Sequence, residues 1–325
     1  MKLLIAKTLL YSLLIFATLE GLSRVFHLYQ QYPASKINNL GVEINTPNQE
    51  GYYVTGNRRM NFSKFNINSS GFNSYREFSP TKENNEIALI GDSFIEGLHQ
   101  DYFNSIGRKV ENRLNDGTEV YEYGYSGYDL ADQLHLIKAY KEQFELIDHI
   151  LIYIKFHNDL KRDTYTPNQY RVDLQYSASF QLRDKVKLIA YADGIGIFEP
   201  FKNLKKKILG RKLNDETEIN YILSEEESEK YLENFKKLIE TFGFDKNKTV
   251  FLLDKKKTSE VFTNYCDHMA YKYIDFGDDL EKSKRPTTLI YDQHWNNHGR
   301  NILANVISDY IREKGHGFSL YRTIL

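Results

Sequence analysis

The stretch Glu86-Ile-Ala-Leu-Ile-Gly-Asp-Ser-Phe-Ile-Glu-Gly97 decides the fold that we expect for this chain. Its apolar part, Ile87–Ile90, ends at Gly91, a pattern typical of a short strand that is buried on both faces of a parallel sheet. The residues that follow place Ser93 at the carboxyl end of this strand, where the chain turns into a helix. Because ligands of open α/β sheets bind at that edge, the stretch predicts both a parallel sheet and a candidate site.

Strands and helices alternate along the rest of the chain. Further runs typical of buried strands cover 119–123, 149–155, 249–253 and 271–276, and helical spacing covers 102–114, 130–144, 224–242 and 297–313. This alternation predicts βαβ units and a parallel sheet with helices on both faces. We therefore expect an α/β fold with a doubly wound parallel sheet of about five strands.

The chain divides into three predicted parts. Residues 1–27 are expected to be a signal or membrane anchor, 28–85 a polar extension of irregular structure with at most short strands, and 86–325 the catalytic body. Within this body, 160–222 break the alternation. We expect them to form an insertion over the carboxyl edge of the sheet, where a lid or substrate-binding loop would lie. The basic run Lys205–Lys207 within it is typical of a solvated surface.

The N-terminus predicts export or anchoring. Lys2 and Lys7 precede the apolar run Thr8–Leu19, which Glu20 interrupts, and no clear small-x-small cleavage site follows. The run is short for a full span, which needs about 20 apolar residues. An uncleaved anchor, a cleaved signal and an amphipathic helix of a soluble domain all stay open. Lysines before the run favour an inside N-terminus, so we expect membrane attachment with a periplasmic or extracellular body.

Composition excludes several classes of protein and of site. The 325 residues carry a net charge of -1 and no basic stripe with interleaved aromatics, which argues against nucleic acid as a partner. Cys266 is the only cysteine, so neither an intramolecular disulfide nor a multi-thiolate zinc site can form, and we expect it to be a small buried apolar residue. The chain has no cofactor-binding fingerprint.

Polar residues follow the predicted strands or precede the last helix. Ser93 would lie at a helix N-terminus, whose free N–H groups can stabilise an oxyanion, unless it only caps that helix. Gly127, in the stretch Tyr121–Gly127, could offer an N–H, and Asn158 a side-chain amide; ordinary turns are the alternative. Because all these positions fall near strand ends or helix starts, they can meet at one edge of the sheet.

Asp292 and His294 lie two apart on the loop before the last helix. This spacing lets the carboxylate hold one imidazole nitrogen while the other faces a nucleophile. The alternative is that both residues serve as caps and turns. His298 follows four residues after His294, a spacing that can bind zinc on a helix, but the glutamate of the metalloprotease motif is absent.

Together these blocks resemble the SGNH/GDSL hydrolases, over about 86–311. The resemblance implies a flavodoxin-like fold, Ser93 as nucleophile, His294 and Asp292 as the rest of a triad, and an oxyanion hole formed by Ser93, Gly127 and Asn158. Two positions depart from the family pattern: Phe156 replaces the usual glycine of the third block, and the aspartate stands two rather than three residues before the histidine. Ile67-Asn-Ser-Ser-Gly-Phe72 is similar to a segment in membrane-anchored bacterial members linked to modification of surface polysaccharides.

The resemblance implies a serine esterase that removes acyl groups, with acetyl on a surface glycan as the favoured substrate. The same residues would serve an O-acetyltransferase, in which a sugar hydroxyl accepts the acyl group. A glycan-binding module without activity is a further alternative. So is a metal-dependent phosphoesterase, for which Asp92, Asn158, Asp159 and His294 would be the ligands. We expect no metal and no cofactor for the serine mechanism.

Overall fold

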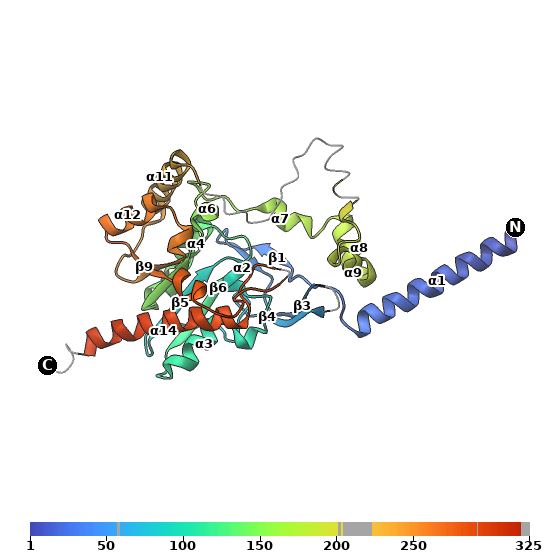
Figure 1. Ribbon diagram of the computed structural model, residues 1–325, viewed down its shortest axis with the longest axis horizontal. Helices are drawn as coiled ribbons and strands as arrows, with labels where there is room; N and C mark the ends of the chain where they lie inside the picture. Colours follow the sequence, from blue (N-terminus) through green and yellow to red (C-terminus); the bar gives the residue numbers. More distant parts are fainter. Residues whose placement is uncertain (57–58, 201–202, 204–222, 291, 320–325) are drawn as a thin grey trace.

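A five-stranded parallel sheet forms the centre of the computed structural model, with the strand order β6-β5-β7-β8-β9 (Figure 1). The structure describes residues 1–56, 59–200, 203, 223–290 and 292–319, with 314–319 as backbone only, so Lys205–Lys207 lies outside the described residues. The α/β fold with its doubly wound sheet is confirmed. The strands are β5 (Glu86–Gly91), β6 (Glu119–Gly124), β7 (His149–Tyr153), β8 (Thr249–Leu253) and β9 (Lys272–Asp275).

Helices cover both faces of the sheet because alternate strand residues point to opposite sides. Ala88 and Ile90 of β5 pack into one apolar core, and Ile87 and Leu89 into the other. Cys266 is buried in the first core, as expected. The first face carries α4 (Leu130–Ala139), α11 (Glu225–Phe242) and α12 (Glu260–His268), and the second carries α3 (Ile106–Leu114) and α14 (Asn297–Ser319).

Some predicted helices have different limits in the structure. The helix expected over 102–114 starts as a 3₁₀ turn, η2 (Tyr102–Asn104), and α3 begins only after Ser105, whose hydroxyl accepts the Arg108 N–H. The helix expected over 130–144 is divided at Tyr140, after which α5 (Lys141–Leu146) follows. Short connecting helices complete this part: η3 (Lys255–Lys257) and α13 (Gly277–Glu281).

The extension over 28–85 is more regular than expected. It forms two antiparallel pairs, β1 (Ser35–Ile37) with β2 (Glu43–Asn45), and β3 (Gln49–Thr55) with β4 (Asn61–Ile67). The prediction of at most short strands was wrong for β3 and β4. In β4 every second residue, from Ser63 to Ile67, is buried. Because one of these buried residues is a polar serine, the sequence does not show the alternation of apolar and polar residues that predicts a strand.

The described part of the insertion is helical, and its outer helices lie away from the sheet. It contains α7 (Gln169–Leu174), α8 (Ala178–Lys185) and α9 (Lys187–Gly194), and the short helix α6 (Phe156–Asp159) precedes it after β7. Figure 1 shows α8 and α9 beside the inner end of α1 (Lys2–Val25), which projects from the body. The expectation that the whole insertion covers the carboxyl edge was therefore wrong for α8 and α9, because the N-terminus of α9 is bound to Glu20 of α1.

Helix α1 is long and apolar enough to cross a membrane, and within the described residues it alone meets that criterion. None of its most apolar window is buried against the rest of the protein. An apolar helix without a protein partner needs an apolar environment, so this exposure fits a membrane span or a signal sequence and argues against a core helix.

Candidate active site

Ser93 lies at the carboxyl end of β5, as the first residue of the short helix α2 (Ser93–Glu96). Asp92 caps α2, since its Oδ1 accepts the Phe94 N–H at 2.9 Å. Its other carboxylate oxygen lies 2.6 Å from the ammonium of Lys155, which follows β7. The capping role that sequence analysis left open for Ser93 thus belongs to Asp92.

The close approach of α2 to β6 depends on Gly124. A Cβ at this position would lie 2.1 Å from the backbone nitrogen of Glu96, far inside van der Waals contact. Because that nitrogen belongs to α2 itself, the helix would have to move to accept a side chain. Gly124 therefore fixes the height at which α2, and with it Ser93, sits over the sheet.

The structure brings Ser93, His294 and Asp292 together. His294 Nε2 lies 2.7 Å from Ser93 Oγ, and its Nδ1 makes a short contact with Asp292 Oδ1. The backbone N–H of His294 also donates to Asp292 Oδ1, at 3.1 Å. The carboxylate therefore holds both the ring and the main chain of the histidine, while the other ring nitrogen faces the hydroxyl, as a triad requires.

The loop that carries Asp292 and His294 is held by a small network ahead of α14. The Leu289 N–H donates to His294 O at 2.9 Å, and the Asn296 side chain donates to Pro286 O and Thr288 O. Trp295 is buried with its ring edge against Phe94, 4.7 Å between ring centroids. These contacts explain why a residue 201 positions from Ser93 can reach its hydroxyl.

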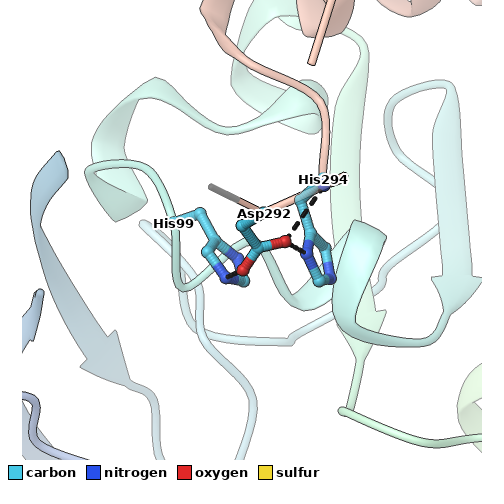
Figure 2. A group of neighbouring side chains, drawn as sticks. All are labelled: His99, Asp292 and His294. Atoms are coloured by element: carbon cyan, nitrogen blue, oxygen red, sulfur yellow. Dashed lines mark hydrogen bonds and ion pairs between the residues drawn. The ribbon is translucent and has the colours of Figure 1, made fainter. Parts of the chain in front are cut away.

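A second imidazole, which sequence analysis missed, contacts the same carboxylate. His99 Nε2 lies 2.5 Å from Asp292 Oδ2, and the His99 and His294 rings stack with centroids 4.0 Å apart. Figure 2 shows Asp292 between the two rings. The His99 contact is short but poorly aligned as a hydrogen bond. No local pattern near His99 could have signalled it, because its partner lies on a distant loop.

The N-terminal extension supports His99. Tyr53 of β3 packs its ring edge-on against the imidazole, 4.7 Å between centroids, and the Asn61 amide of β4 donates to His99 O at 2.9 Å. The Lys64 N–H donates to Asp101 Oδ1 on the same loop, at 2.9 Å. Strands β3 and β4 of the extension therefore pack against the loop over 96–101, which carries His99.

The motif Ile67–Phe72 forms the turn that attaches this extension to the sheet. Asn68 Oδ1 accepts the N–H groups of Ser70 and Phe72, and Gly71 has a positive φ of 90°. The Phe72 ring is buried against Phe78 and Tyr123. Glycine suits this turn, because a Cβ at Gly71 would also lie 2.6 Å from a backbone oxygen.

Burial and hydrogen bonding set the protonation of the two partners. Burial disfavours the ionised form of Asp292, but its contacts with His294 and His99 outweigh this and hold its pKa well below the usual range. Burial lowers the pKa of His99, although the contact with Asp292 opposes the shift. Near neutral pH the group is therefore an ionised carboxylate beside a neutral His99.

No hydrogen bond among the described residues joins Ser93 to Gly127 or Asn158, the other two expected oxyanion residues. Asn158 is exposed, and its side-chain oxygen accepts a hydrogen bond from Lys161 at 2.9 Å. Gly127 has a φ of 81°, and the guanidinium of Arg171 lies where its Cβ would be. Phe156, which stands in place of the usual glycine, is buried against Phe262 and also lines the cavity described below.

The metal hypothesis fits the geometry less well than the triad. Two imidazoles and a carboxylate are suitable ligands, and His99, Asp292 and His294 have ligand atoms within 4.8 Å of one another. A zinc ion would hold each atom at about 2.0–2.2 Å, so ligand atoms on either side of it lie 3 Å or more apart. Here the carboxylate oxygens contact the ring nitrogens directly.

The set Asp92, Asn158, Asp159 and His294 is also unsuited to a metal. The Lys155 ammonium lies at Asp92, and the Lys155 N–H donates to Asp159 Oδ2 at 2.7 Å. Burial raises the pKa of Asp159 well above its usual range, which favours its neutral form. A lysine cation and a protonated carboxyl are poor surroundings for a divalent cation.

A cavity of about 910 Å³ adjoins the site. Residues next to the triad in sequence line it, namely Phe94, Gln293 and Trp295, together with Lys155. Its far wall comes from the segments after β8 and β9, including Lys257, Thr258 and Phe276. The cavity therefore lies at the carboxyl ends of the strands, where the fold predicts a ligand.

Comparisons with known proteins find similar solved structures only. No protein-family model and no curated protein matches the chain. A lipase/acylhydrolase from Enterococcus faecalis is 14% identical over 70% of this chain and 96% of its own, with a TM-score of 0.39. The esterase EstA from Pseudoalteromonas sp. is 11% identical over 72% and 100%, with a TM-score of 0.42. A G-D-S-L family lipolytic protein from Veillonella parvula is 14% identical over 68% and 94%, with a TM-score of 0.34.

Proposed function

We propose that the chain is a serine esterase of the SGNH type that transfers acyl groups through Ser93. The observation that carries this proposal is the chain of contacts from Asp292 through His294 to the Ser93 hydroxyl. A hydroxyl is a weak nucleophile at neutral pH and needs an adjacent base that a third group holds in place. This order of carboxylate, imidazole and hydroxyl is the one that acyl-transfer enzymes use.

In the proposed reaction, His294 Nε2 takes the Ser93 proton as Oγ attacks the ester carbonyl carbon. The ionised Asp292 keeps the Nδ1 proton in place and stabilises the imidazolium that forms. His294 then gives its proton to the leaving alcohol, and the acyl group stays on Ser93. Water, activated in turn by His294, releases the acyl group and restores the hydroxyl.

The oxyanion hole is part of the proposal. The backbone N–H groups of Ser93 and Gly127 and the side-chain amide of Asn158 would surround the oxyanion. Asn158 Nδ2 would be the donor, since Lys161 contacts the Oδ1 atom. Loss of one such donor typically reduces kcat about 10²- to 10³-fold. Asn158→Ala should show this loss with KM little changed, whereas an unchanged rate would remove Asn158 from the site.

We propose an acyl, most simply acetyl, group on a glycan as the substrate, with water or a sugar hydroxyl as acceptor. The adjoining cavity supports this, because it is large enough for a sugar and has Phe94 and Trp295 in its wall. An O-acetyltransferase would use the same triad. The two are distinguished by offering a glycan acceptor with an acetyl donor and measuring acetylated glycan against free acetate.

We also propose that α1 anchors the chain in a membrane, with the catalytic body on the outer side. The support is the exposed apolar surface of α1 together with Lys2 and Lys7 near its N-terminus.

The test of the esterase is hydrolysis of p-nitrophenyl acetate by the full chain in detergent. Ser93→Ala and His294→Ala should each lose nearly all activity, while Ser179→Ala and His268→Ala, at exposed positions away from the site, should not. A fluorophosphonate should label the wild type at Ser93 and a chelator should leave the rate unchanged. Equal rates in the four variants would exclude Ser93 as nucleophile.

A further inference from the structure

The inner end of α1 is joined to the insertion by specific polar contacts. The Glu20 carboxylate accepts the N–H groups of Lys187 and Leu188, at 3.1 and 2.7 Å, which are the first residues of α9. Arg24 Nη2 donates to Lys185 O at 2.7 Å and is paired with Glu20 at the same distance. An acid from α1 therefore satisfies N–H groups that every helix leaves free at its start.

This junction makes the last turns of α1 part of the folded body. Ser23 is 2% exposed, whereas the apolar residues before Glu20 are all exposed. Glu20, the first acidic residue of the chain, is also the first residue that the rest of the protein partly covers, although Leu22, Val25 and Phe26 after it are again exposed. If α1 spans a membrane, its outer surface must lie close to this residue, because a carboxylate is costly inside the hydrocarbon layer.

If α1 spans a membrane in this way, helices α8 and α9, which we call the anchor collar, would lie at the level of the membrane surface, because Figure 1 shows them beside the body-side end of α1. The collar and the residues next to it expose apolar side chains that no described part of the protein covers: Leu182 is 53% and Ile197 54% exposed. Tyr176, just before α8, is 67% exposed. Tyrosines and lysines are enriched where proteins meet lipid headgroups, since they combine an apolar stem with a polar end.

We propose that the anchor collar rests on the lipid surface around the point where α1 leaves the bilayer, and that α1 is retained in the mature protein. This inference rests on the proposed membrane anchor but not on the proposed esterase. Removal of a leader would take Glu20 away and leave the first N–H groups of α9 without this acceptor. The collar would hold the body at a fixed height and tilt relative to the membrane.

The test places a fluorescent label at matched positions of the full chain. In a Cys266→Ser background, Leu182→Cys puts the label on the collar, and Met269→Cys puts it on an exposed apolar position at the end of α12, at the opposite end of the molecule in Figure 1. Each labelled chain is reconstituted singly into nanodiscs of phosphatidylcholine and phosphatidylglycerol, with or without a lipid that carries a shallow nitroxide quencher.

We expect the quencher lipid to remove most of the emission from a label at 182 and little from a label at 269, because surface-bound helices lie about 5–10 Å into the headgroup region. Glu20→Ala should reduce the quenching at 182 by releasing α9. Equal, weak quenching at both positions would overturn the proposal that the collar rests on lipid. This result would also be expected if the collar instead binds a partner protein. A mature chain that lacks residues 1–25 by intact mass would overturn retention. Neither measurement depends on esterase activity.

Discussion

Two loops bring an imidazole to the same carboxylate, and they differ in what else each imidazole contacts. The loop that carries Asp292 and His294 places the His294 ring between Asp292 and Ser93, where it can move a proton. The loop over 96–101 places His99 on the other oxygen of Asp292, buried under Tyr53 and facing no hydroxyl among the described residues. The difference shows that an imidazole next to the carboxylate is not necessarily a general base. Its second ring nitrogen must also face a nucleophile.

On this comparison we propose His294 as a catalytic residue and His99 as a positioning residue. His99 restrains the carboxylate oxygen that His294 does not use, so the other oxygen stays aligned with the His294 ring. Its stacking on His294 also limits rotation of that ring. The predictions below separate these two roles.

The largest effect is expected from His294→Ala. Without a base to take the Ser93 proton, kcat for p-nitrophenyl acetate should fall about 10⁴-fold or more. In His99→Ala, kcat should fall much less, so the ratio of kcat in the two variants separates the catalytic role from the positioning role. Equal losses in the two variants would mean that His99 shares the proton-transfer role.

A smaller loss is expected from His99→Phe, which keeps an aromatic ring but removes the contact to Asp292. Removing a group that orients a catalytic ligand typically costs about 10- to 100-fold in activity, and we expect a loss of this size in kcat with KM nearly unchanged. His99→Gln should recover part of the rate, because its amide can donate to Asp292. If Phe and Gln behave alike, His99 acts through packing only.

Tyr53→Leu should weaken the support of His99 without touching the triad. An aromatic pair contributes about 0.5–1.5 kcal/mol beyond its buried area, so kcat should fall by no more than about tenfold. Tyr53→Phe is the matched control and should keep the wild-type rate. A double-mutant cycle compares Tyr53→Leu in the wild type and in the His99→Phe variant. If Tyr53→Leu lowers kcat by the same factor in both, Tyr53 does not act through His99.

The smallest effect is on stability and concerns pH. Burial lowers the pKa of His99 in the folded protein below its unfolded value, so the unfolded chain binds a proton more readily. The free energy of unfolding should therefore fall as the pH falls below about 6.5, the unperturbed value for histidine. In His99→Gln this part of the slope should vanish. Urea unfolding between pH 5 and pH 8 would detect it, and identical slopes would contradict a neutral, buried His99.

Much of the fold followed from short-range patterns. Ile87–Ile90 and the other apolar runs marked all five parallel strands, because a strand buried on both faces must be apolar along its whole length. The same kind of pattern did not predict strands β3 and β4 of the extension. In β4 a buried Ser63 replaces one apolar residue, and β3 finds its register only by pairing with β4.

The sequence by itself determined the residues that could react. Local sequence is enough to predict Ser93, because it follows a buried strand. The same holds for Asp292 and His294, because they lie two positions apart and just before a helix. Only the tertiary structure decided the rest. His99 contacts Asp292, which lies 193 positions further along the chain, and β4 holds the loop that carries His99. Glu20 binds the first residue of α9, which lies 167 positions further along. Contacts between distant segments leave no local periodicity, because they depend on how the whole sheet and its helices pack.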